Sequence, residues 1–153
     1  MSAVTAIVPT YNRAELLGEC LSSLLSQTLP PETILVVNDG STDRTPEILD
    51  RFDAHISVIE QENSGKSVAL NRALAECSAD YVWICDDDDV ADPAGLEALK
   101  SGLDVHPQAP FAYGRFQRFR DVDGKHSFEE PGFFGREEEE RFFIQALEET
   151  FAS

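Results

Sequence analysis

Short apolar stretches alternate with longer amphipathic ones along the first hundred residues. The apolar stretches are rich in β-branched residues and predict four strands, at residues 3–9, 33–37, 56–59 and 81–85. The segments between them carry apolar residues at helical spacing, and another such segment follows the fourth strand. This alternation is typical of βαβ units. We therefore expect a single α/β domain whose open, mostly parallel sheet has helices on both faces.

Local signals mark where the helices begin. Asn12, with Glu15 three residues later, has the spacing of a capping box. Pro46 suits the first position of the second helix, and Asp92 before Pro93 predicts the start of the fourth.

The periodic pattern changes after residue 107. Residues 111–119 predict an added strand or hairpin, Asp123-Gly124 a tight turn, and residues 136–151 a terminal helix. We therefore divide the domain, residues 1–153, into a core at 1–107 and an added part at 108–153.

Four consecutive acids, Asp86-Asp87-Asp88-Asp89, directly follow the fourth predicted strand, which we expect to be buried. Adjacent carboxylates repel one another and contribute nothing to a core. In an open α/β sheet, however, ligands bind at the carboxyl ends of the strands, and Mg²⁺ or Mn²⁺ prefers carboxylate oxygen. A solvated acidic loop is the simpler alternative. We favour a metal site because the other three strand ends carry matching chemistry.

Polar or flexible residues follow each of those three strands, and parallel strands bring them to one edge of the sheet. They are Thr10, Tyr11 and Asn12 after the first strand, Asp39 after the second, and Asn63, Gly65 and Lys66 after the third. Singly, each has a simpler interpretation as a helix cap, a turn, a loop glycine or a solvated lysine.

Together these residues fit a nucleoside diphosphate. Asp39 can accept hydrogen bonds from a base or a ribose, and Lys66 brings a cation and free backbone N–H groups to a helix start. Asp86 and Asp88 would bring a metal that clamps the diphosphate and acts as a Lewis acid on the leaving phosphate.

Other phosphate and metal sites fit less well. The sequence has neither a G-x-G-x-x-G after the first strand nor a G-x-x-x-x-G-K-[ST], so a dinucleotide cofactor or a P-loop is not expected. Residues 86–97 place acids at three calcium-loop positions, but Val90 and Ala91 stand where an oxygen ligand and a glycine are needed. A phosphoacceptor receiver domain remains a weaker alternative, because it would need an acidic pair after the first strand.

The net charge of the chain limits which classes of partner are expected. With 29 acidic and 12 basic residues the net charge is -17, and no local basic patch is visible, so nucleic acid is not an expected partner. The 3 cysteines form no CxxC pair and are expected to be reduced thiols. No signal peptide or bilayer-spanning run is visible. We expect a cytoplasmic location, with peripheral association at the inner membrane as the alternative.

Four motifs, in this order and spacing, resemble family 2 glycosyltransferases of the GT-A fold. They are Ile-Val-Pro-Thr-Tyr-Asn-Arg at 7–13, Val-Asn-Asp-Gly-Ser-Thr-Asp at 37–43, Asn-Ser-Gly-Lys at 63–66 with Ala-Leu-Asn at 69–71, and the acids at 86–89. The resemblance implies a Rossmann-like sheet and transfer, with inversion, of a sugar from a UDP- or GDP-sugar to an acceptor hydroxyl. The acceptor would be a saccharide, lipid or protein, and the cofactor Mn²⁺ or Mg²⁺.

By position, the resemblance implies that Pro9, Thr10 and Tyr11 line the nucleotide pocket and that Asp39 holds the base. Asp86 and Asp88 would form the DxD motif, with Asp88 as the main metal ligand. The remaining residues implied are Asn12, Asn63, Gly65, Lys66 and Asp87 for the donor, and Asp89 in support of the metal.

Two features depart from the family pattern. Leu70 and Ala73 replace an arginine and a glycine that are frequent there. The family's catalytic base, commonly in a Glu-Asp pair of the acceptor-binding half, is not identified, because the sequence contains no such pair. We expect a donor-binding half, truncated or naturally short, that transfers sugar poorly alone. A nucleotide-sugar-binding module without turnover is the alternative.

Overall fold

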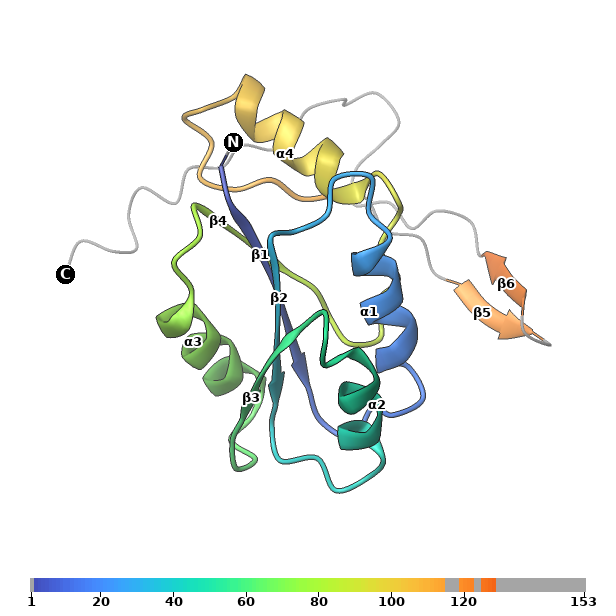
Figure 1. The fold of residues 1–153 in the computed structure, drawn as a ribbon. Helices are drawn as coiled ribbons and strands as arrows, with labels where there is room; N and C mark the ends of the chain where they lie inside the picture. The colour runs from blue at the N-terminus through green and yellow to red at the C-terminus, as the bar shows by residue number, and fades with distance from the viewer. Residues whose placement is uncertain (1, 115–118, 123–124, 129–153) are drawn as a thin grey trace. The chain divides into compact units, whose positions relative to one another are not determined.

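The computed structural model describes residues 2–114, 119–122 and 125–128 (Figure 1). The chain forms two compact units, residues 1–97 and 98–153, which we describe separately. The first unit holds a four-stranded sheet in the order β3-β2-β1-β4. Its strands are β1 (Val4–Thr10), β2 (Thr33–Asn38), β3 (Ser57–Glu60) and β4 (Tyr81–Ile84), and every neighbouring pair is parallel. The predicted open parallel sheet is confirmed.

Three helices cover the two faces of this sheet, as expected (Figure 1). They are α1 (Leu17–Leu25), α2 (Thr45–Phe52) and α3 (Lys66–Glu76). The α1 and α2 helices pack with alternate strand residues in one apolar cluster, and α3 packs in the other. Ala69 and Ala73 are fully buried, so α3 meets the sheet through small side chains. Because every residue of β1 is buried, the centre of the core lies along this strand.

The register brings the strand ends to one edge. Thr10 pairs with Asn38, and Asn38 pairs with Glu60, so β1, β2 and β3 end together. The β4 strand stops at Ile84, opposite Ile7. The acids that follow β4 therefore continue beside the last residues of β1, as the sequence predicted.

Three local predictions are wrong. The α1 helix begins at Leu17, with Leu16 at the N-cap and no side-chain cap, so Asn12 and Glu15 form no capping box. Pro46 is the second residue of α2. Asp92 caps a turn, accepting a 2.9 Å bond from the N–H of Ala94, and α4 (Gly95–Val105) begins later.

The β4 strand is less buried than predicted. Val82 is 37% exposed and Ile84 is 50% exposed. The reason is its position, because within the described part of the chain β4 has β1 as its one strand neighbour. The exposed edge does not displace the strand end, which is still anchored by the hydrogen bond from the N–H of Cys85 to the carbonyl oxygen of Ile7.

The cysteines form no disulfide, as expected, with Cys20 and Cys85 buried and Cys77 half-buried. Burial, reinforced by the nearby acids, raises the pKa of Cys20 to about 12. None of the helices in the described residues is long and apolar enough to cross a membrane.

The second unit contains the rest of α4 and an antiparallel hairpin of β5 (Phe119–Val122) and β6 (Lys125–Phe128). The hairpin starts where the sequence prediction, at 111–119, ended. The predicted turn at 123–124 and the terminal helix at 136–151 lie outside the described residues.

Candidate functional site at the strand ends

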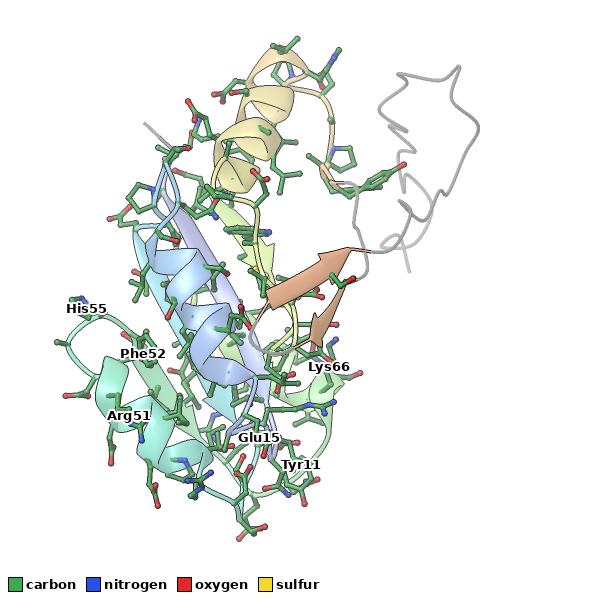
Figure 2. The ribbon with its side chains drawn as sticks, turned by 90° about the vertical axis from the view of Figure 1, so that its right-hand side faces the viewer. Tyr11, Glu15, Arg51, Phe52, His55 and Lys66 are labelled. Atoms are coloured by element: carbon green, nitrogen blue, oxygen red, sulfur yellow. The ribbon has the colours of Figure 1, made fainter. Side chains whose placement is uncertain are left out.

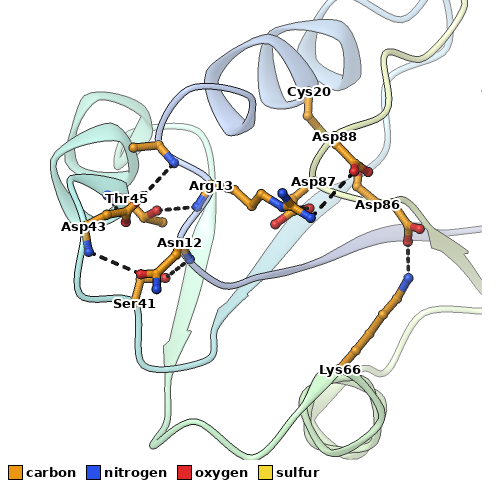
Figure 3. A network of polar contacts seen from close by, with 11 residues as sticks. Asn12, Arg13, Cys20, Ser41, Asp43, Thr45, Lys66, Asp86, Asp87 and Asp88 are labelled. Atoms are coloured by element: carbon orange, nitrogen blue, oxygen red, sulfur yellow. Dashed lines mark hydrogen bonds and ion pairs between the residues drawn. The ribbon is translucent and has the colours of Figure 1, made fainter.

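Asn12 joins the loops that follow β1 and β2 (Figure 3). Its backbone is left-handed, with φ 53, a conformation that asparagine tolerates better than most residues. Its Oδ1 accepts hydrogen bonds from the N–H groups of Thr42 (2.7 Å) and Asp43 (3.2 Å), and its own N–H donates to Ser41 Oγ at 2.9 Å. The side chain predicted to be a helix cap or a donor contact is thus committed to holding two loops together.

Asp43 makes a second connection between the same loops. Its Oδ2 accepts from the N–H of Ala14 at 3.1 Å, and its Oδ1 accepts from the N–H of Thr45 at 2.9 Å. Thr45 Oγ1 in turn accepts from the N–H of Arg13 at 3.0 Å. Hydrogen bonding from Thr45 lowers the pKa of Asp43, so this carboxylate stays ionised at neutral pH. The two loops are therefore fixed to each other by the protein's own side chains.

Asp39 fixes the loop after β3 in place by hydrogen bonds, as Asn12 and Asp43 fix the loops after β1 and β2. The residue is 4% exposed, and Oδ1 accepts from Gln61 Nε2 at 2.6 Å and from the N–H of Ser64 at 2.8 Å. Oδ2 accepts from the N–H of Gly65 at 2.8 Å. Burial raises the pKa of Asp39, but these three hydrogen bonds outweigh it and the pKa is lowered. Asp39 is thus a clamp on residues 61–65, and its role as a base contact stays a prediction.

Gly40 is needed where β2 leaves the sheet. Its φ is 73, and a Cβ there would lie 2.8 Å from the backbone nitrogen of Asn63. We expect Gly40→Ala to lower the free energy of unfolding by about 2 kcal/mol, through the left-handed backbone and this backbone clash. Gly18→Ala is the matched control, because its Cβ would meet only Ile48 at 3.7 Å and should stabilise α1 by roughly 0.5 kcal/mol. Urea unfolding of both variants checks this, and equal shifts of the same sign would contradict it.

Three of the four acids form ion pairs with two basic side chains from other strand ends (Figure 3). Lys66 Nζ lies 2.5 Å from Asp86 Oδ1. Arg13 reaches the next two acids, with Nε 3.6 Å from Asp87 Oδ1 and Nη2 3.9 Å from Asp88 Oδ2. Asp86 and Asp88 are about half exposed, at 45% and 47% of their side chains. Loops after β1, β3 and β4 thus contribute charged groups to one site. The sequence predicted Lys66, Asp86 and Asp88 there but did not assign a role to Arg13.

The other two acids differ in exposure, because Asp87 is buried and Asp89 is exposed. Burial raises the pKa of Asp87 against the opposing effects of a hydrogen bond with the Thr10 side chain and of the Arg13 charge. Partial desolvation of its carboxyl, then repulsion from Asp86 and Asp88, raises the pKa of Asp89. The carboxylates are therefore close enough to repel one another, which a cation would relieve. Within the residues that the structure describes, however, no group of three or more acids, histidines or cysteines is placed to hold a metal by itself.

Ser23 of α1 and Gln27, just after the end of α1, hold the segment that follows the four acids, which the sequence did not predict. Ser23 Oγ accepts from the N–H of Ala91 at 2.9 Å. Gln27 Nε2 donates to the carbonyl oxygen of Asp92 at 2.7 Å, and its Oε1 accepts from the N–H of Leu96 at 2.9 Å. Both side chains are buried. The sequence signal was a pair of polar residues four positions apart, one among the apolar residues of α1 and one just after them, where a buried polar group needs partners.

The residues after β1 differ in how accessible they are. Pro9 and Thr10 are buried. Tyr11 is 46% exposed and lies toward the same end of the unit as Lys66 (Figure 2). Asn63 is also exposed. Tyr11, Asn63, Lys66 and Asp88 are therefore exposed to a ligand, and Asp86 is partly exposed.

This sheet, with its acids and bases at the strand ends, is the Rossmann-like sheet of GT-A enzymes. The structure of Staphylococcus aureus TarS 1-349 in complex with UDP matches with a TM-score of 0.63 and 30% identity, over 69% of this chain and 33% of that one. A mannosyltransferase from Pyrobaculum calidifontis in complex with GDP-Man and Mn²⁺ matches with a TM-score of 0.55 and 36% identity, over 59% and 28%.

The sequence comparison identifies the family. The family described as "Glycosyl transferase family 2" matches residues 5–152, so the chain belongs to this family of transferases. It is 41% identical over 128 residues to glycosyltransferase GlyA of Streptococcus pneumoniae serotype 4, over 82% of this chain and 18% of that protein. Glycosyltransferase GlyG of the same organism is 32% identical, over 82% and 42%. The chain thus spans less than half the length of these relatives.

Proposed function

We propose that this chain binds a nucleoside-diphosphate sugar together with Mn²⁺ or Mg²⁺, as the donor-binding part of an inverting glycosyltransferase. The observation that carries the proposal is the pair of half-exposed carboxylates, Asp86 and Asp88, beside Lys66 at the carboxyl edge of the sheet. Two similar structures, in complex with UDP and with GDP-Man and Mn²⁺, support it. The receiver-domain alternative is not retained, because the chain belongs to a transferase family.

The donor set suits a divalent cation that is shared with a ligand. Asp88 and Asp86 would hold the metal, with Asp89 beside them, and these residues supply carboxylate oxygen only, as hard cations prefer. Phosphate oxygens of the donor would complete the coordination shell. When bound, the metal would stabilise negative charge on the leaving diphosphate as a Lewis acid.

The remaining exposed residues would bind the other parts of the donor. Lys66 opens α3, so its ammonium group and the positive end of the helix dipole lie together, an arrangement that favours phosphate. The exposed ring of Tyr11 offers a surface for stacking against the base. Asn12 and Asp39 would act mainly by fixing the loops that carry these groups. The acceptor would be a hydroxyl of a saccharide, lipid or protein.

Calorimetric titration with UDP and GDP tests the proposal. In Mn²⁺ or Mg²⁺ we expect at least one nucleotide to bind, and in EDTA we expect binding to weaken by at least about tenfold, since a shared metal links the two ligands. Metal alone should bind weakly, because the described residues present few ligands. Equal affinity in EDTA would contradict the metal role, and absence of binding by either nucleotide would contradict donor binding. Release of nucleotide from a UDP- or GDP-sugar then separates a transferase from a binding module.

A further inference from the structure

Arg13 is positioned by the fold to face the acidic segment. Its backbone N–H is held by Thr45 Oγ1 at 3.0 Å, immediately after the left-handed residue Asn12. From this fixed base its guanidinium reaches both Asp87 and Asp88, at 3.6 Å and 3.9 Å (Figure 3). The contacts are long and the side chain is 48% exposed, so they contribute little to stability. The arrangement instead places a positive charge beside Asp88, the expected main metal ligand.

The sum of charges shows what this positive charge does. In ionised form the four acids carry four negative charges, and Lys66 and Arg13 supply two positive charges. A divalent cation would bring this group to neutrality, and a neutral group does not repel the diphosphate that follows. Without Arg13 the metal-loaded group would keep one negative charge, which opposes a diphosphate but attracts a free cation.

We propose that Arg13 is a specificity-determining residue of the donor site, which disfavours a free divalent cation and favours the cation that is paired with a nucleoside diphosphate. This inference rests on the proposed function, because it concerns the same metal and the same donor. It assigns to Arg13 two effects of opposite sign. A side chain that merely stabilised the loop would change both affinities in the same direction or leave both unchanged.

The test is Arg13→Gln, with Mn²⁺ binding followed by electron paramagnetic resonance and nucleotide binding by calorimetry in saturating Mn²⁺. We expect Mn²⁺ alone to bind more tightly by about threefold or more, and UDP or GDP to bind more weakly by about threefold or more, as for a screened charge near the surface. Arg13→Lys keeps the charge and should restore most of both affinities.

Arg44→Gln is the matched control, because it removes the same charge from the neighbouring loop. Arg44 is exposed and has no ion pair within the part of the chain that the structure describes. We expect both affinities of this variant to equal those of the unmodified protein. The inference is overturned if Arg13→Gln moves both affinities in one direction or neither, or if Arg44→Gln reproduces its effects. Failure of the unmodified protein to bind any nucleotide with Mn²⁺ would instead remove the proposed function, and this inference with it.

Discussion

Replacing Asp39 by alanine is expected to lower the free energy of unfolding by about 4 kcal/mol, because it removes three hydrogen bonds to a charged acceptor. The donors are the Gln61 amide and the backbone N–H groups of Ser64 and Gly65. Each hydrogen bond to a charged group is typically worth about 1.5–3 kcal/mol, and the lower end applies because water can reach the exposed loop. Urea unfolding measures the loss.

Asp53→Ala is the control for this experiment, since Asp53 is an exposed acid with no side-chain hydrogen bond among the described residues. The free energy of unfolding of Asp53→Ala should stay within about 0.5 kcal/mol of that of the unmodified protein. One other result for Asp39→Ala would support the interpretation from the sequence, in which Asp39 contacts the base or ribose of the nucleotide. If the variant kept its stability and lost nucleotide affinity by about tenfold or more, the main role of Asp39 would be to contact the nucleotide, not to hold the loop.

The pH dependence of stability tests the same clamp independently. The pKa of Asp39 is lowered in the folded protein. Its contribution is therefore complete above the unfolded pKa of about 3.9 and is lost as the pH falls through the folded value. We expect the stability gap between the unmodified protein and Asp39→Asn to be constant near neutral pH and to narrow below about pH 4. Urea midpoints measured from pH 7 downward check this, and a gap that widens in acid would refute it.

The strand ends were predictable because their signals are local. Each strand of the sheet is a short apolar run, each run is followed by polar residues, and parallel topology brings such residues to one edge. The convergence of Lys66 and Asp86, 20 positions apart, follows from this rule alone. The burial of β4 was not predictable in the same way, because it depends on whether a second strand lies beside it.

The direction in which a polar side chain faces could not be read from the sequence. Asp39 and Asp88 both follow strands and both look like ligand contacts, yet one is enclosed by three internal donors and the other is half exposed. The donors to Asp39 lie 22 to 26 residues later in a loop whose path the pattern does not specify. Similarly, Asn12 has the spacing of a cap, but its left-handed backbone turns it toward Thr42.

Replacing Asp88 by alanine should abolish the metal-dependent part of nucleotide binding while leaving the fold intact. The Asp88 side chain is 47% exposed, and its ion pair to Arg13 is 3.9 Å long, so we expect the free energy of unfolding to change by less than about 0.5 kcal/mol. Mutation of residues that only support metal ligands typically lowers metal affinity about 10–100-fold. Loss of a direct ligand should therefore lower the metal affinity on the order of 100-fold or more.

The Asp88 measurement is a titration of UDP or GDP with Mn²⁺ and again with EDTA. For Asp88→Ala the two affinities should converge on the EDTA value of the unmodified protein, because the nucleotide then binds only through its own contacts. Asp53→Ala, an acid removed elsewhere on the surface, should keep the full difference and so exclude a general effect of net charge. Asp89→Ala separates the two candidate ligands, because Asp89 is also exposed and is repelled by the neighbouring Asp86 and Asp88. If Asp89→Ala abolished the metal dependence and Asp88→Ala preserved it, Asp89 would replace Asp88 as the main metal ligand.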